Sequence, residues 1–244
     1  MQRGGKRKFG EQDFTGSQPM SQLAKRRRYD AARARLRYSK AFVPRGPKYF
    51  GPVPTYGSFK FKYSELLSLN APIGIATYHT FRANSLFDPD FTSTGHQPYG
   101  FDQIMALYWH FTVVGAKITV ETVNSDTTTV PTIVFCRTRA QADTITDMAA
   151  IMEAPRTDWA LIAAGGAPTR RVSSTFGASN FFGKQFVVGG SDYRGSSSAN
   201  PNELAFFQVG IAGANIGDDP QAQNVCVTIE FSAVMTEPRI QTQS

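Results

Sequence analysis

The chain has 244 residues, 41% of them hydrophobic and 12% aromatic, which is enough to fill the core of one sizeable domain but not two. Its net charge of +7 is unevenly spread: residues 1–48 hold fourteen Lys and Arg against three acids, whereas residues 49–244 hold twelve against sixteen. No apolar run approaches the length of a membrane span, and no apolar stretch follows the charged N-terminus. These features argue against a secreted or membrane-inserted protein.

Residues 1–48 form a separate segment with a net charge of +11. Their only large aliphatic residues are Leu23, Leu36 and Val43, so the segment cannot bury enough apolar area to offset the entropy of ordering it. We therefore predict a basic, largely disordered arm. The stretch from Ser21 to Lys40 is rich in Ala and Arg, so it could become helical against a polyanion.

The arm's cationic side chains predict nucleic-acid binding. Guanidinium and ammonium groups bind phosphates and release condensed counterions, which gives strong affinity without sequence preference. The candidate nucleic-acid-binding residues are Lys6, Arg7, Lys8, Lys25, Arg26, Arg27, Arg28, Arg33, Arg35, Arg37 and Lys40.

One of these clusters has a second interpretation. Lys25, Arg26, Arg27 and Arg28 form a short basic run of the kind that nuclear import factors bind, so it is also a candidate nuclear localisation signal. The simpler alternative is a run of charge that only contacts nucleic acid.

From residue 49 onward the hydrophobic period is mostly two, which predicts a β domain over residues 49–244. The segment from Val225 to Met235 alternates most clearly, with apolar residues at every odd position. The segment from Trp109 to Glu121 alternates too, but its phase slips at Gly115, which indicates a β-bulge. The other predicted strands cover residues 58–64, 73–83, 130–138, 169–177 and 205–212, with 185–188 as a weak eighth.

One helix is expected in a connection between strands. Asp143 is its candidate N-cap, Ile145, Met148 and Met152 lie on one face, and Pro155 follows its end. Seven or eight strands joined by long connections rich in Gly, Ser and Pro favour an eight-stranded antiparallel jelly-roll sandwich over an up-and-down barrel. An immunoglobulin-like sandwich fits the strand pattern but leaves much of the chain unexplained.

The cysteines and histidines lack the spacing of a reactive or metal site. Cys136 and Cys226 lie far apart in predicted strands, so we expect free thiols and no metal. No nucleophile or metal ligand accompanies the histidines at regular spacing, so we expect structural roles and no enzyme activity. They are His79, His96 and His110.

The acidic residues Asp88 and Asp90, with Asp102 nearby in sequence, leave two interpretations open. Carboxylates flanking Pro89 could bind a divalent cation at a subunit contact. Alternatively, they accept backbone N–H bonds within a turn, which is the more frequent role of Asp at such positions.

Residues 81–120 resemble the capsid proteins of circular, Rep-encoding single-stranded DNA viruses, the broad group that contains the circoviruses. The specific part consists of three short motifs followed by a long strand that begins with aromatic residues. The motifs are Phe81-Arg82-Ala83-Asn84-Ser85, Asp88-Pro89-Asp90, and Gly95-His96-Gln97-Pro98-Tyr99-Gly100-Phe101-Asp102-Gln103.

This resemblance implies a jelly-roll subunit that self-assembles into the smallest (T=1) icosahedral shell, of about 60 identical copies. It implies that the arm packages circular single-stranded DNA. The expected partners are other copies of the chain, the DNA genome, host nuclear import factors and a host-cell attachment receptor. The expected locations are the virion and the host nucleus. No cofactor is implied.

A second function fits the same arm. The chain could instead be a single-stranded nucleic-acid-binding protein with a β-sandwich domain that forms no shell. In either case, the stretches 124–129 and 189–202 are expected to be exposed loops because they are rich in small and polar residues.

Overall fold

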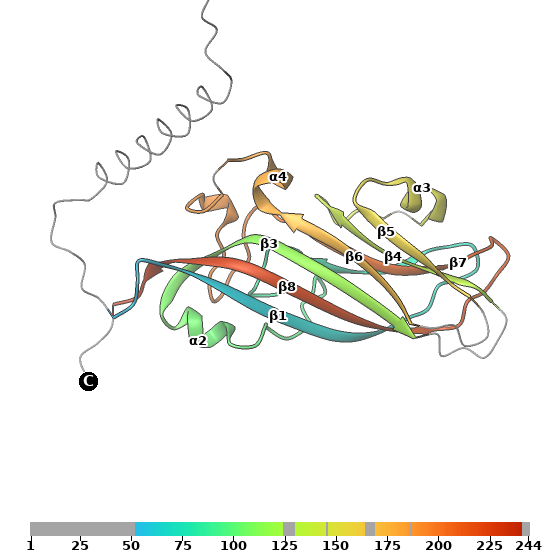
Figure 1. Cartoon of the computed structure of the whole chain (residues 1–244), viewed down its shortest axis with the longest axis horizontal. Coiled ribbons are helices and arrows are strands. Elements are labelled where there is room, and N and C mark those ends of the chain that lie inside the picture. Colours follow the sequence, from blue (N-terminus) through green and yellow to red (C-terminus); the bar gives the residue numbers. More distant parts are fainter. Residues whose placement is uncertain (1–51, 124–129, 145, 164–168, 186, 241–244) are drawn as a thin grey trace, which may run out of the picture. The chain divides into compact units, whose positions relative to one another are not determined.

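The computed structural model describes residues 52–240 except 124–129, 145, 164–168 and 186. Within these residues, eight strands form two four-stranded sheets, and every pairing is antiparallel (Figure 1). The strands are β1 (Tyr56–Leu69), β2 (Thr77–Arg82), β3 (Tyr108–Val123), β4 (Thr132–Arg139), β5 (Thr157–Ile162), β6 (Arg170–Gly177), β7 (Phe206–Gly213) and β8 (Gln223–Pro238).

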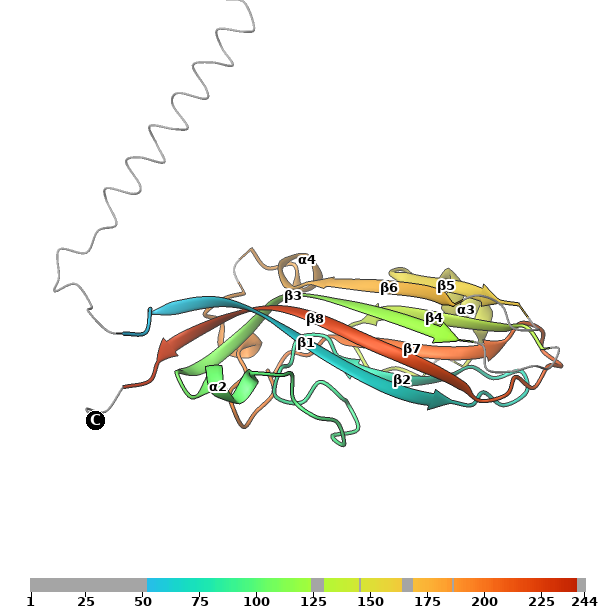
Figure 2. The ribbon, with the colours of Figure 1, turned by 60° about the horizontal axis from the view of Figure 1, so that its bottom comes forward.

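The strand order identifies the architecture as a jelly roll. One sheet has the order β1-β8-β3-β6 and the other β2-β7-β4-β5, and the two lie one above the other (Figure 2). The first strand pairs with the last, the second with the seventh, the third with the sixth and the fourth with the fifth. This nested pairing results when one long hairpin, with its turn between β4 and β5, rolls up into two sheets. The predicted eight-stranded antiparallel jelly roll is therefore confirmed.

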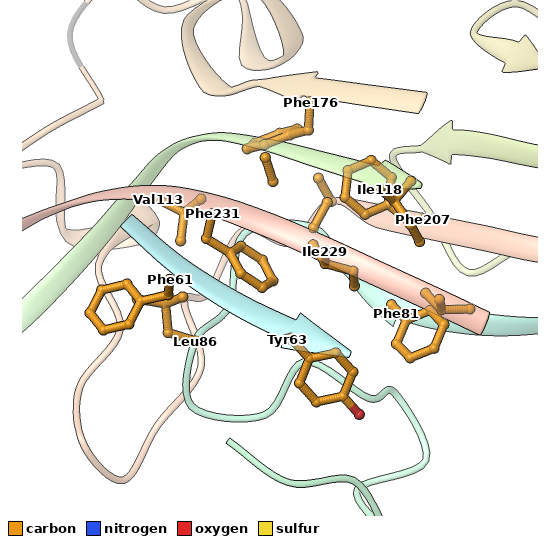
Figure 3. Close-up of a cluster of buried hydrophobic side chains, with 14 of the residues drawn as sticks. Phe61, Tyr63, Phe81, Leu86, Val113, Ile118, Phe176, Phe207, Ile229 and Phe231 are labelled. Atoms are coloured by element: carbon orange, nitrogen blue, oxygen red, sulfur yellow. The ribbon is translucent and has the colours of Figure 1, made fainter. Parts of the chain in front are cut away.

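The core lies between the two sheets. Along β8, the predicted alternation is confirmed: Val225, Val227, Ile229, Phe231, Ala233 and Met235 are each at most 1% exposed. Figure 3 shows Ile229 and Phe231 of β8 beside Phe61 of β1, together with Phe81 and Phe207 of the opposite sheet. Burial of these large apolar side chains drives the packing of one sheet on the other.

The β-bulge predicted in the third strand is present. The pairing of β3 with β8 shifts register between Val113 and Gly115, which leaves Val114 as the extra residue. Because the bulge resets the phase, Phe111 and Val113 on one side and Ile118 on the other all face the core.

Within the described connections there are three short α-helices and one 3-10 turn: α2 (Phe101–Met105), α3 (Met148–Glu153), α4 (Ala178–Phe182) and η1 (Ser191–Tyr193). Helix α3 is the predicted one, but the prediction of Asp143 as its N-cap was wrong. Asp147 caps the helix and accepts from the Ala149 N–H at 3.1 Å. Asp143 is unavailable because its carboxylate pairs with Arg139.

Two strand boundaries also differ from the prediction. The eighth strand is β5, whereas residues 185, 187 and 188 of the weak candidate are not in a strand. β2 begins at Thr77 rather than residue 73, because a turn precedes it in which the Ile75 N–H donates to the Pro72 carbonyl at 3.1 Å.

The two cysteines are free thiols, as predicted, and lie in different sheets. Cys136 in β4 is fully buried, and burial raises the pKa of its thiol. Cys226 in β8 is only half-buried. Neither thiol faces the other, because Cys226 lies on the side of its sheet away from the core.

The two predicted loops differ in what the structure reveals. Half of the residues in the loop at 189–202 are exposed, whereas Gly195 and Pro201 are buried and Gly195 exchanges two backbone hydrogen bonds with Phe111. The stretch 124–129 lies outside the described residues. In the described part of the chain, none of the helices has the length and apolarity to cross a bilayer.

Candidate functional site

All predicted nucleic-acid-binding residues, from Lys6 to Lys40, lie outside the described residues, as does the import cluster Lys25–Arg28. The motif segment 81–103, in contrast, is described throughout. It forms most of the connection between β2 and β3. Its polar residues join into a network that we call the loop brace, made of Arg82, Asn84, Ser85, Asp88 and Asp90.

Arg82, the last residue of β2, closes the first turn of this loop. Its side chain is largely buried, and one guanidinium nitrogen donates to the Asp88 carbonyl at 2.9 Å, the Asp88 carboxylate at 2.8 Å and the Asp90 carbonyl at 2.7 Å. The guanidinium also lies over the Phe91 ring, 5.0 Å from its centroid. A second guanidinium nitrogen donates to the Phe91 carbonyl at 3.4 Å, so the planar group combines donors on two nitrogens with the ring contact, which a lysine ammonium could not reproduce.

Asp90 is the buried carboxylate of the loop brace. It accepts hydrogen bonds from the Thr92 N–H at 2.9 Å, the Thr92 hydroxyl at 2.8 Å and His79 Nε2 at 2.8 Å. Burial alone would raise the pKa of Asp90, but the hydrogen bonds from Thr92 and the nearby His79 outweigh it, so the pKa is lowered. The turn interpretation of Asp90 fits this geometry, since protein donors occupy both carboxylate oxygens.

Acid should weaken the loop brace through Asp90. A carboxyl with a lowered pKa in the folded state contributes stability above its unfolded pKa of about 3.9, and this contribution is lost as the pH falls through the folded value. In Asp90→Asn we expect the free energy of unfolding to be about 2 kcal/mol lower than in the unsubstituted chain at pH 7, and we expect this difference to shrink below pH 4. Urea unfolding of both chains between pH 3 and pH 7 measures this; a pH-independent difference would contradict it.

A second contact anchors the loop to β1. The Tyr63 side chain is fully buried and donates to the Glu65 carboxylate, and its ring stacks on His96 with centroids 4.4 Å apart. Burial, together with the bond to Glu65, raises the pKa of Tyr63. A Cβ at Gly95 would lie 2.6 Å from the Tyr63 hydroxyl and 2.7 Å from Asp90 Cβ. Only glycine fits there without displacing one of these contacts.

Asn84 and Ser85 connect the loop to the segment that precedes β7. The Asn84 amide donates to the Glu203 carbonyl at 2.7 Å and accepts from the Ala205 N–H at 3.0 Å. The Ser85 hydroxyl donates to the Asn200 side-chain oxygen at 2.5 Å. Both side chains are almost completely buried, so the contacts bridge two connections at the same end of the sandwich.

Removal of the Asn84 amide should destabilise the domain. In Asn84→Ala, the Ala205 N–H and the Glu203 carbonyl lose their partner while buried, which should cost about 2 kcal/mol. Chemical denaturation measures the change. Asn215→Ala is a matched control because Asn215 is exposed and bonded only to the nearby Asp218, so it should change stability by less than about 0.5 kcal/mol. Equal effects of the two substitutions would contradict the prediction.

The three histidines each make a structural contact, as predicted. His79 binds Asp90, His96 stacks on Tyr63, and His110 Nδ1 lies 3.0 Å from Glu237. Asp102 lies in the first turn of α2. Among the described residues, no group of three or more His, Cys, Asp or Glu is arranged to hold a metal ion.

Arg137 is a buried charge that the sequence analysis missed. Its side chain is fully buried on the outer side of β4, where Nε donates to Gln208 at 2.7 Å and one terminal nitrogen lies 3.8 Å from Asp143. Neither terminal nitrogen has a hydrogen-bond partner in the part of the chain that the structure describes. Burial lowers the pKa of the guanidinium, and Asp143 partly offsets this effect. The signal in the sequence is an arginine that continues the apolar run of β4.

No family model matches the sequence, and no curated protein matches it. Solved structures of viral proteins overlap the chain at low identity. The 60-mer BFDV capsid protein aligns with a TM-score of 0.44 and 8% identity over 79% of this chain and 100% of its own.

Two plant virus structures are comparable. Cocksfoot mottle virus aligns with a TM-score of 0.44 and 13% identity, over 75% of this chain and 97% of its own. Turnip yellow mosaic virus aligns with a TM-score of 0.43 and 13% identity, over 78% and 99%. Structural similarity at this level does not identify the family or the function of the chain. The jelly-roll assignment is therefore based on the strand order.

Proposed function

We propose that this chain is a viral capsid protein, a structural rather than catalytic molecule that self-assembles into a closed shell. The proposal is based on two features that occur together in this chain. A complete eight-stranded jelly roll follows an N-terminal segment with a net charge of +11. Viral capsids are a principal use of this fold, and a strongly basic segment suits the packaging of any nucleic acid sequence.

In its specific form, the proposal is a T=1 shell of about 60 copies that packages circular single-stranded DNA through residues 1–48. The arms would together supply about 660 positive charges, the order needed to neutralise much of a genome of one to two kilobases. The resemblance of residues 81–103 to capsid proteins of circular single-stranded DNA viruses supports this form. The loop brace gives that motif a role in holding the subunit's connections together.

The proposed route includes the host nucleus. Lys25, Arg26, Arg27 and Arg28 would bind import factors before assembly, and the finished shell would meet a host-cell receptor through its exposed loops. A fusion of residues 1–48 to a fluorescent protein tests the first part. Nuclear accumulation that disappears when these four residues become Ala supports the signal; accumulation unchanged by the substitutions refutes it.

Electron microscopy of the purified full-length chain tests the capsid proposal. We expect closed particles about 20 nm across, the size of the smallest shells. A chain that stays monomeric at every salt concentration and pH would overturn the proposal.

The alternative is a single-stranded nucleic-acid-binding protein without a shell, and the net charge of +11 favours it equally. The two functions differ in what remains when nucleic acid is digested. A capsid leaves closed particles after nuclease treatment, whereas a coating protein falls apart into small species that light scattering distinguishes.

A further inference from the structure

The two outer faces of the sandwich differ in chemistry. The outer face of the β2-β7-β4-β5 sheet carries an apolar cluster in which Ile151 of α3 packs on Phe135 and Ala212. The outer face of the β1-β8-β3-β6 sheet is polar instead. Here Lys60 and Lys62 of β1 and Lys117 of β3 are all exposed.

The strand register brings these three lysines together. Lys62 pairs with Glu230 of β8, which pairs on its other side with Lys117. Lys60 lies one outward position away along β1, opposite Ser232. The lysines, Glu230, Ser232 and Thr175 of β6 line a shallow hollow of about 500 Å³. We call this hollow the lysine face.

The lysine face concentrates positive charge on a domain that is otherwise acidic. Residues 49–244 have a net charge of −4 and contain four lysines, of which three lie here. None of the three makes an ion pair among the described residues, although Glu230 lies between two of them. The arginines that are paired with carboxylates, and so contribute less to the surface field, are Arg82, Arg137, Arg139, Arg171 and Arg194.

We propose that the lysine face binds the phosphodiester backbone of single-stranded nucleic acid, as a second contact beyond the arm. Lys62 and Lys117 lie two strands apart, or about 10 Å, so separate phosphates can meet separate ammonium groups. The hydroxyls of Ser232 and Thr175 add donors for phosphate oxygens. The binding needs no base readout, as packaging requires. The proposal rests on nucleic acid being the partner, but not on shell formation.

Chain connectivity favours the same partner. The last candidate binding residue of the arm, Lys40, lies 16 residues before the start of β1 at Tyr56, a stretch that spans at most about 55 Å. Nucleic acid held near Lys40 is therefore tethered within that distance of the strand that carries Lys60 and Lys62, which raises its effective concentration there. The proposal also orients the subunit, because the β1-β8-β3-β6 sheet then faces the nucleic acid.

Lysine acetylation of the full-length chain tests the proposal directly. The chain is treated with an acetylating reagent with and without a single-stranded DNA of about 20 nucleotides, and each lysine is quantified by mass spectrometry. We expect at least about threefold protection of Lys60, Lys62 and Lys117 by DNA at low salt, lost at high salt. Lys184, which is exposed elsewhere on the domain, is the internal control and should not change.

Substitution provides the second measurement. The salt dependence of affinity for single strands has a slope of about −0.7 per phosphate contact, so Lys60→Gln, Lys62→Gln and Lys117→Gln combined should reduce the slope by about 2. Lys184→Gln should leave the slope unchanged.

Three outcomes would overturn the proposal. The first is a salt-dependence slope that the triple substitution leaves unchanged. The second is acetylation of the three lysines that does not change when DNA is added. The third is equal protection of these lysines in particles that contain no nucleic acid, which would identify the lysine face as a subunit contact. If the triple variant does not fold, the acetylation experiment on the chain without substitutions decides whether the lysine face binds DNA. A failed capsid proposal is recognised separately, by the absence of particles.

Discussion

Deleting residues 2–48 should remove almost all packaged nucleic acid. The deletion removes fourteen cationic side chains and leaves a domain with a net charge of −4, which repels phosphate overall. A protein that makes six to ten phosphate contacts loses about 10³ to 10⁵ in affinity when salt rises from 50 to 200 mM, and losing the contacts themselves should cost at least about as much. We therefore expect affinity for single-stranded DNA to fall by about 10³ or more.

Two measurements follow this deletion. Fluorescence anisotropy with a labelled oligonucleotide gives the affinity, and the ratio of absorbance at 260 and 280 nm gives the nucleic acid content of particles. A variant with the residues of the arm in shuffled order is the matched control, because charge-driven binding does not depend on their sequence. Full affinity after deletion, or affinity lost on shuffling, would contradict the assigned role of the arm.

Arg137 offers the largest expected effect on stability. Arg137→Ala removes the bulkiest fully buried side chain of the described domain, leaves a cavity and takes away the donor to the Gln208 side-chain oxygen. We expect Arg137→Ala to lower the free energy of unfolding by about 3 to 5 kcal/mol. Arg137→Met should cost clearly less than Arg137→Ala, because it loses the same donor to Gln208 but keeps most of the volume and removes a buried charge whose terminal nitrogens make no hydrogen bond among the described residues.

Thermal and chemical unfolding of these variants separate charge from volume. Arg139→Ala is the control, because Arg139 pairs with Asp143 at 2.6 Å but its side chain is 27% exposed, so its loss should cost less than about 1 kcal/mol. If Arg137→Met were as destabilising as Arg137→Ala, the guanidinium itself would be the source of stability, and the volume argument would be wrong.

The sequence predicted those strands in which one face is buried and the other is polar. β8 alternates over its whole length, and the phase slip at Gly115 located the bulge in β3 to within one residue. β5 was missed because its apolar residues do not mark one buried face: Trp159 and Leu161 remain 43% and 47% exposed, so no alternation develops. Alternation of apolar and polar residues arises when one face of a strand is buried. A strand without a buried face therefore shows no such alternation in its sequence.

Local signals failed where another residue bound the side chain that carried the signal. Asp143 has the sequence position of an N-cap, but Arg139 binds its carboxylate and the helix begins after Asp147. The motif at 81–103 was recognised by resemblance alone. Its role in bracing the connections depends on Glu203 and Ala205, more than a hundred residues away, and no local pattern reports such contacts.

The position of β8 has a consequence for how this protein is made. β8 lies between β1 and β3 in the middle of its sheet, yet it is the last strand of the domain to leave the ribosome. β1 waits for a partner some 170 residues later, from Thr236 opposite Tyr56 to Gln223 opposite Leu69. Until then β1 and β3 present open edges, so the domain folds only after synthesis of its final segment. A chain that ends before β8 therefore lacks the central strand between β1 and β3.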